Sequence, residues 1–129
     1  MGLITLLSSN PTVFILVAVS LIFALCVHEF SHGIIAYHYG DDTAYKNGRL
    51  TLNPLNHLDP IGSLMILFIG IGYAKPVPVN PYNLNNPRMD MIKVAAAGPI
   101  SNFILSFFGV ILLTLFFKMG LVTEHLETF

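Results

Sequence analysis

The chain is poor in charge and in cysteine. Of its 129 residues only 10% are charged, and the formal net charge is −1. A soluble domain carries about 25% charged residues, so this sequence has too little charge to cover a surface that faces water. The absence of a Lys/Arg cluster excludes a nucleic-acid-binding class, and the high apolar content excludes disorder. Cys26 is the single cysteine, which excludes an intramolecular disulfide and a CxxC metal or redox site.

Long apolar runs dominate what is present. Hydrophobic residues make up 54% of the chain, and the mean hydropathy is +0.72. Residues 11–27 carry no charge and have the length of a membrane-spanning helix, which needs about 17–25 mostly apolar residues. Residues 94–117 form a second and clearer span, bracketed by Lys93 and Lys118. Residues 61–74 are shorter and predict a short or re-entrant segment.

The first apolar stretch has recognisable helix boundaries. Asn10 is placed to cap a helix that has Pro11 at its first position, and Gly40 is a typical residue just past a helix end. The apolar run can therefore continue as one helix from residue 11 almost to Gly40.

Two polar stretches connect the apolar ones. An Asn-Gly turn signal followed by an alternating run at residues 49–52 predicts a small β-element. Residues 75–91 hold four of the eight prolines and predict an extended loop. The fold class is therefore an α-helical integral membrane protein with about three hydrophobic segments. Two of them span the membrane, one is short or re-entrant, and the small β-element lies in the connecting loop.

The candidate chemistry is concentrated in an HExxH motif, His28-Glu29-Phe30-Ser31-His32. Residues four apart lie on the same face of a helix, so the two imidazoles can ligate one Zn²⁺. Glu29 is within reach of a metal-bound water and can act as general base and then general acid. A chance match on a long helix is the alternative interpretation. The position at the end of an apolar span favours the metal site, because ionisable groups are costly in lipid.

HEFSHG at the end of a transmembrane helix resembles the site-2 protease family of intramembrane zinc metalloproteases. Three further motifs resemble the small prokaryotic members of that family, in the same order and at similar intervals. They are RLTLNPLNHLDPIG at residues 49–62, YAKPVPVNP at residues 73–81 and AAGPISN at residues 96–102. The resemblance covers residues 11–117.

This resemblance implies hydrolysis of peptide bonds within or near the membrane. It makes His28 and His32 zinc ligands and Glu29 the catalytic general base and acid. It also implies Zn²⁺ as cofactor, a membrane-anchored protein or peptide as substrate, and a multi-pass protein of a prokaryotic cell membrane.

The sequence departs from the family at the third zinc ligand. Family members carry an aspartate in an LDG-type motif on a later transmembrane helix, and no such motif occurs before Phe129. A catalytic zinc usually has three protein ligands and a water. We therefore expect residues 1–129 to be a single membrane-embedded core that is incomplete at its C-terminus. A ligand from elsewhere and a degenerate site are the alternatives. Asp59 is a weaker candidate ligand, and a helix cap is its favoured interpretation.

Polar and small residues interrupt the third span at Gly98-Pro99 and Asn102. A kinked helix that packs closely through small residues is the favoured interpretation. Asn102 is also the candidate substrate-binding residue, because it can face the cavity and contact substrate backbone or polarise a carbonyl. The two interpretations are compatible. His38 is expected at the membrane interface and His125 in solvent.

Three function classes remain: an intramembrane zinc metalloprotease, a non-proteolytic pseudoprotease that keeps its metal site, and a small metal-binding or transporting membrane protein. Glu29 favours the protease, because a purely structural site has no use for a base beside the metal. A transport path would need more polar groups in the spans. The expected partners are the lipid bilayer and a membrane-anchored substrate, with no nucleic acid. The oligomeric state is left open.

Overall fold

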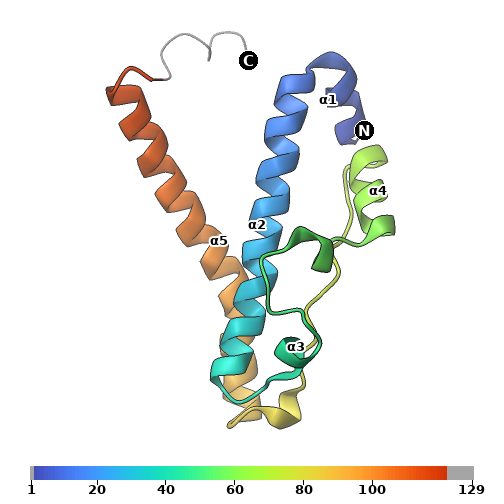
Figure 1. Ribbon diagram of the computed structural model, residues 1–129, viewed down its shortest axis with the longest axis vertical. Coiled ribbons are helices and arrows are strands. Elements are labelled where there is room, and N and C mark those ends of the chain that lie inside the picture. Colours follow the sequence, from blue (N-terminus) through green and yellow to red (C-terminus); the bar gives the residue numbers. More distant parts are fainter. Residues whose placement is uncertain (1, 122–129) are drawn as a thin grey trace.

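The computed structural model describes residues 2–121, and every regular element in this part of the chain is helical. In chain order these elements are α1 (Leu3–Ser9), α2 (Pro11–His38), α3 (Thr43–Lys46), η1 (Pro54–Asn56), α4 (Pro60–Phe68), η2 (Pro81–Asn83) and α5 (Pro87–Lys118). The long helices α2 and α5 pack against each other. α1 precedes α2, and the other short elements lie in the connection between α2 and α5 (Figure 1).

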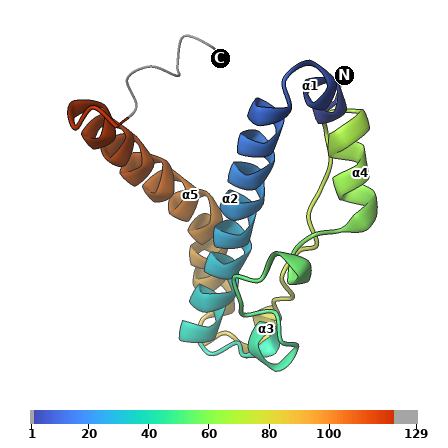
Figure 2. The same cartoon turned by 45° about the horizontal axis from the view of Figure 1, so that its top comes forward.

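α2 and α5 form a V. In both views they lie together where the chain leaves α2 and enters α5, and they diverge toward the start of α2 and the end of α5 (Figures 1 and 2). α1 and α4 pack together beside the start of α2. Both helices are long and apolar enough to cross a membrane, and their apolar 18-residue windows have mean hydropathies of 2.5 in α2 and 2.3 in α5. Most of their apolar surface is exposed within this chain, which suits lipid or further protein around them.

The boundaries of α2 are those that the sequence predicts. The Asn10 side chain accepts a hydrogen bond from the backbone N–H of Val13 at 3.2 Å, and Pro11 occupies the first turn. The helix ends at His38, and Gly40 then takes a φ of 107°, which favours glycine. The structure therefore confirms Asn10 as the cap of α2, Pro11 as its first residue and Gly40 as the glycine just past its end.

The second apolar stretch forms only the nine-residue helix α4. Asp59 caps this helix, because its side chain accepts a hydrogen bond from the backbone N–H of Gly62 at 2.8 Å. After Gly70 the chain leaves helical structure and runs without regular elements to residue 80. The segment is short, as expected, and its path relative to a bilayer stays a prediction.

Residues 49–52 do not form the expected β-element, and the described part of the chain holds no strand. The Arg49 guanidinium instead donates hydrogen bonds to the backbone carbonyls of Lys75 and Pro76, at 3.0 and 3.2 Å. A side chain therefore joins the two segments where a strand ladder would use backbone groups, and prolines in the facing segment have no N–H for a ladder. The extended loop predicted for residues 75–91 is also shorter, because α5 begins at Pro87.

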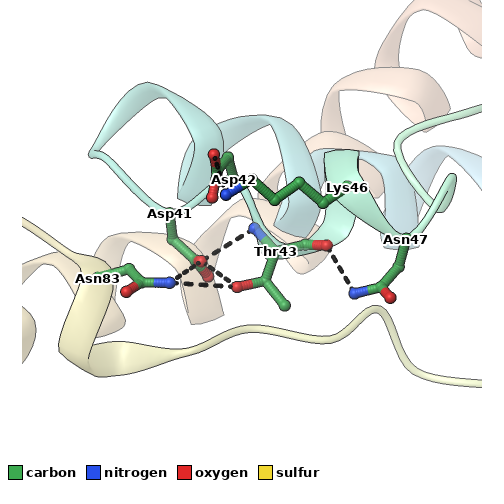
Figure 3. Close-up of polar contacts among 6 residues, drawn as sticks. All are labelled: Asp41, Asp42, Thr43, Lys46, Asn47 and Asn83. Carbon is green, nitrogen blue, oxygen red and sulfur yellow. Dashed lines mark hydrogen bonds and ion pairs between the residues drawn. The ribbon is translucent and has the colours of Figure 1, made fainter.

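A buried carboxylate fastens the proline-rich loop to the end of α2 (Figure 3). Asp41 is 1% exposed, and its Oδ1 accepts hydrogen bonds from the N–H and hydroxyl of Thr43 and from the amide of Asn83. Its Oδ2 accepts from the backbone N–H of Asn80 at 2.8 Å. Burial by itself would raise the pKa of Asp41, but these hydrogen bonds outweigh burial and hold the pKa below its usual range.

Candidate metal centre

The three motif residues lie together on α2, in the half where it packs against α5. The ligand atoms of His28, Glu29 and His32 all lie within 4.8 Å of one another. The two imidazole rings meet edge to face, with centroids 4.7 Å apart. A spacing of four residues places both rings on one face of the helix, one turn apart. The structure therefore brings together the three residues that the sequence predicts as a zinc site.

α5 presents a glycine to the two rings. A Cβ built on Gly98 would lie 2.5 Å from Nε2 of His32 and 2.6 Å from Nε2 of His28. Real Cβ atoms essentially never approach so closely, so only glycine leaves this space open. Both Nε2 atoms are consequently directed toward the same small space at the surface of α5.

The protonation of His32 follows from its other ring nitrogen. Nδ1 lies 2.7 Å from the backbone carbonyl oxygen of Val94. A carbonyl can only accept a hydrogen bond, so Nδ1 carries the proton and the neutral ring keeps a free lone pair at Nε2. Metal-ligating histidines almost always donate their second N–H in this way, often to a backbone carbonyl. His32 is therefore prepared to bind a metal through Nε2.

Asn102 of α5 lies beside the other histidine. Its amide group is 3.3 Å from Nδ1 of His28, and its Oδ1 is buried without a hydrogen-bond partner. The side chain thus contacts the ring at the nitrogen opposite to the one that faces Gly98. Its predicted contact with substrate stays a prediction.

Glu29 is held by the proline-rich loop. The side chain is largely buried, at 8% exposure, and Oε2 accepts a hydrogen bond from the backbone N–H of Val77 at 3.1 Å. One carboxylate oxygen is thereby fixed in place, and no protein donor to the other is found among the described residues. A carboxylate oriented in this way beside two imidazoles has the position that a general base requires.

The donor set fits zinc. Two imidazole nitrogens face one glycine-lined space, and tetrahedral Zn²⁺ binds readily to histidine nitrogen. Within residues 2–121, the cluster contains His28, Glu29 and His32 and no other His, Cys, Asp or Glu. Asp59 serves as the cap of α4. His38 packs edge to face against its neighbour Tyr39, and His125 lies outside the described residues.

Sequence reasoning missed the backbone and glycine contributions to this centre. Val77, Val94 and Gly98 act through an N–H, a carbonyl and the lack of a side chain. Two signals in the sequence point to them. Val77 and Gly98 lie within motifs that carry the family resemblance, at residues 73–81 and 96–102, and Gly98 is one of the small residues that favour close helix packing.

The chain is similar to bacterial proteins whose names state a zinc metalloprotease. It is 48% identical over 103 residues to "Putative zinc metalloprotease YwhC" of Bacillus subtilis, a match that covers 80% of this chain and 47% of that protein. It is 37% identical over 99 residues to "Putative zinc metalloprotease Rip2" of Mycolicibacterium smegmatis, and 32% identical over 100 residues to the Rip2 of Mycobacterium tuberculosis. Both Rip2 matches cover 73% of this chain and 38% of the relative.

The chain thus spans about half the length of these curated relatives or less. No family model matches the chain, and no solved structure matches it significantly.

Proposed function

From the homology of this chain to bacterial zinc metalloproteases of the site-2 protease family, we propose that it hydrolyses peptide bonds of membrane-associated substrates. The observation that carries the proposal is the centre itself. His28 and His32 direct their Nε2 atoms at the space left by Gly98, and the buried carboxylate of Glu29 lies beside them.

Each residue of the centre has a defined task in this proposal. His28 and His32 would hold zinc through Nε2, and bound zinc supplies a Lewis acid that lowers the pKa of a water molecule. Glu29 takes a proton from the attacking water at its free carboxylate oxygen and returns it to the departing nitrogen. The N–H of Val77 keeps the other oxygen of Glu29 in place during both transfers.

The proposal also includes where the protein is located and which class of substrate it cleaves. The exposed apolar surfaces of α2 and α5 suit a multi-pass protein of a bacterial cell membrane. The segment at residues 71–80 has no regular structure and passes beside Glu29. A membrane-anchored substrate can lie extended beside this segment, which would bring the scissile bond to the carboxylate.

The test combines zinc content with cleavage in lipid vesicles, using membrane-anchored peptide substrates. Glu29→Gln should retain zinc and lose cleavage by about 10²–10⁴-fold, because the amide cannot accept the proton. His28→Ala should lose zinc and cleavage together. His38→Ala is the matched control, since it removes an exposed histidine of the same helix outside the cluster, and both properties should survive. A Glu29→Gln variant that still cleaves would refute the role of the carboxylate as general base.

A second candidate function is a pseudoprotease or metal-binding membrane protein. It is favoured by one observation: the cluster in the described residues offers two histidines, where a catalytic zinc usually has three protein ligands. Zinc bound through His28 and His32 with no cleavage of any substrate would support this function in place of the protease.

A further inference from the structure

Three residues of α5 form a stripe that faces the two histidines. Val94, Gly98 and Asn102 are spaced four apart, so they lie on one side of the helix. Gly98 is opposite the Nε2 atoms, while Val94 and Asn102 contact the Nδ1 atoms of the two rings, one from each side of the glycine. α5 therefore contacts Nδ1 of each ring and leaves open space at each Nε2.

The amide of Asn102 has two orientations with different consequences for His28. In the observed one, Nδ2 faces Nδ1 of His28 at 3.3 Å, and Oδ1 is buried without a donor. A donating Nδ2 would need a bare Nδ1, and the neutral ring would then carry its proton on Nε2, where it blocks a metal. A half-turn of the amide brings Oδ1 to Nδ1. The oxygen then accepts the Nδ1–H, Nδ2 takes the buried position that Oδ1 held, and Nε2 is left bare for a metal.

We infer that Asn102 is a positioning residue for His28: its side-chain oxygen accepts the Nδ1–H and thereby holds Nε2 free for the metal. The carbonyl of Val94 does the same for His32. α5 thus offers a hydrogen-bond acceptor to Nδ1 of both ligands. The inference rests on the proposed metal centre and gives Asn102 a role at the ligand, in place of a contact with substrate.

The first test is zinc affinity in detergent, measured by competition with a chelating dye. Asn102→Leu keeps the shape of the side chain and removes the acceptor, so the affinity should fall by about 10–100-fold. Asn102→Asp restores an acceptor and should bind zinc at least as tightly as the parent, to within about threefold. Thr114→Val is the matched control, because it removes an exposed hydroxyl of the same helix that bonds only the carbonyl of Val110, and its affinity should equal that of the parent. An Asn102→Leu variant with parental affinity, or an Asn102→Asp variant as weak as it, would overturn the inference.

The second test reads the tautomers directly, without metal. Nitrogen-15 NMR of histidine-labelled chain at alkaline pH distinguishes Nδ1–H from Nε2–H, and we expect Nδ1–H for both His28 and His32. In Asn102→Leu the proton of His28 should redistribute to Nε2, while His32 keeps Nδ1–H and reports that α5 is still packed. A parent with Nε2–H at His28, or a His28 signal unchanged in Asn102→Leu, would refute the inference.

The two readouts separate the inference from the proposed function. If the parent binds no zinc but Asn102→Leu shows the tautomer shift, the proposed metal centre is wrong and the positioning role of Asn102 is supported. If the parent binds zinc but Asn102→Leu shows no tautomer shift, the metal centre is supported and the positioning role of Asn102 is wrong.

Discussion

His28 and His32 differ from ordinary helix histidines in what their ring nitrogens touch. One nitrogen of each ring faces a polar group of α5, and the other faces the space at Gly98. A histidine that merely filled a core would have no need for a glycine opposite its second nitrogen. The arrangement leaves both Nε2 atoms free to bind a ligand.

The space at Gly98 can be tested with a single methyl group. In Gly98→Ala the new Cβ would meet both Nε2 atoms at about 2.5–2.6 Å, so the rings or α5 must shift. Zinc affinity measured by dye competition should fall by at least about 10-fold, the size of effect seen when the surroundings of a metal ligand are disturbed.

Gly109→Ala is the matched control for that variant. Gly109 is in the same helix, and a Cβ there meets nothing within 4 Å. Alanine is favoured over glycine within a helix by about 1 kcal/mol, so this variant should keep zinc affinity and gain slightly in thermal stability. Equal zinc affinity in both alanine variants would show that the space at Gly98 has no role in metal binding.

At the scale of the elements, the loop between α2 and α5 holds the Glu29 side chain in place. Asp41 fastens this loop through Asn80 and Asn83, and the same loop supplies the Val77 N–H that binds Glu29. Loss of the buried carboxylate leaves its donors without a partner, which costs about 1–3 kcal/mol. The position of Glu29 is therefore coupled to a contact at the end of α2.

We expect Asp41→Ala to release the loop and leave the two histidines in place. Hydrogen exchange of peptides that cover residues 76–86 should become faster, and cleavage activity should fall while zinc affinity stays within about threefold of the parent. Asp42→Ala is the control, because the side chain of Asp42 is 44% exposed and its surface ion pair with Lys46 contributes little to stability (Figure 3). Unchanged exchange in Asp41→Ala would contradict the coupling.

The same carboxylate predicts a pH dependence. The pKa of Asp41 is lowered in the folded chain, so its contribution to stability is complete above the unfolded pKa of about 3.9. The contribution is then lost as the pH falls through the folded pKa. Thermal unfolding of the parent should therefore shift to lower temperature in this acid range. The unfolding temperature of Asp41→Asn should fall less over the same pH range. An equal fall in the parent and in Asp41→Asn would contradict the role of Asp41 in this pH dependence.

The sequence predicts the elements well where local signals govern them. Asn10 and Gly40 mark the ends of α2, and Asp59 marks the start of α4, because capping depends on neighbours along the chain. The prediction of a β-element at residues 49–52 was wrong, because strand pairing depends on a partner that is far away in sequence. The contacts of Gly98 and Asn102 with the histidines depend on how α5 packs on α2, which no local pattern encodes.

At the scale of the molecule, α2 and α5 are the two helices within residues 2–121 that are long and apolar enough to cross a membrane. The loop between them supplies the Val77 N–H that binds Glu29. If each crosses once, the start of α2 and the end of α5 lie on one side, and the end of α2, η2 and the start of α5 lie on the other. The connection also reaches back, because α4 packs against α1 beside the start of α2. This arrangement places the open end of the V away from α3 (Figure 2).

Cysteine accessibility tests this topology. In a Cys26→Ala background, single cysteines at Ser8 and Leu121 should react with an impermeant thiol reagent from one face of a vesicle. A cysteine at Tyr82, which is 92% exposed in the loop, should react from the opposite face. Labelling of all three positions from the same face would contradict two single crossings.

The central claim is that His28 and His32 hold zinc on this chain, and zinc content tests it most directly. The purified 129-residue chain in detergent should bind about one zinc, and the His28→Ala/His32→Ala double variant should bind none. A parent without zinc, or a double variant with as much zinc as the parent, would contradict the account.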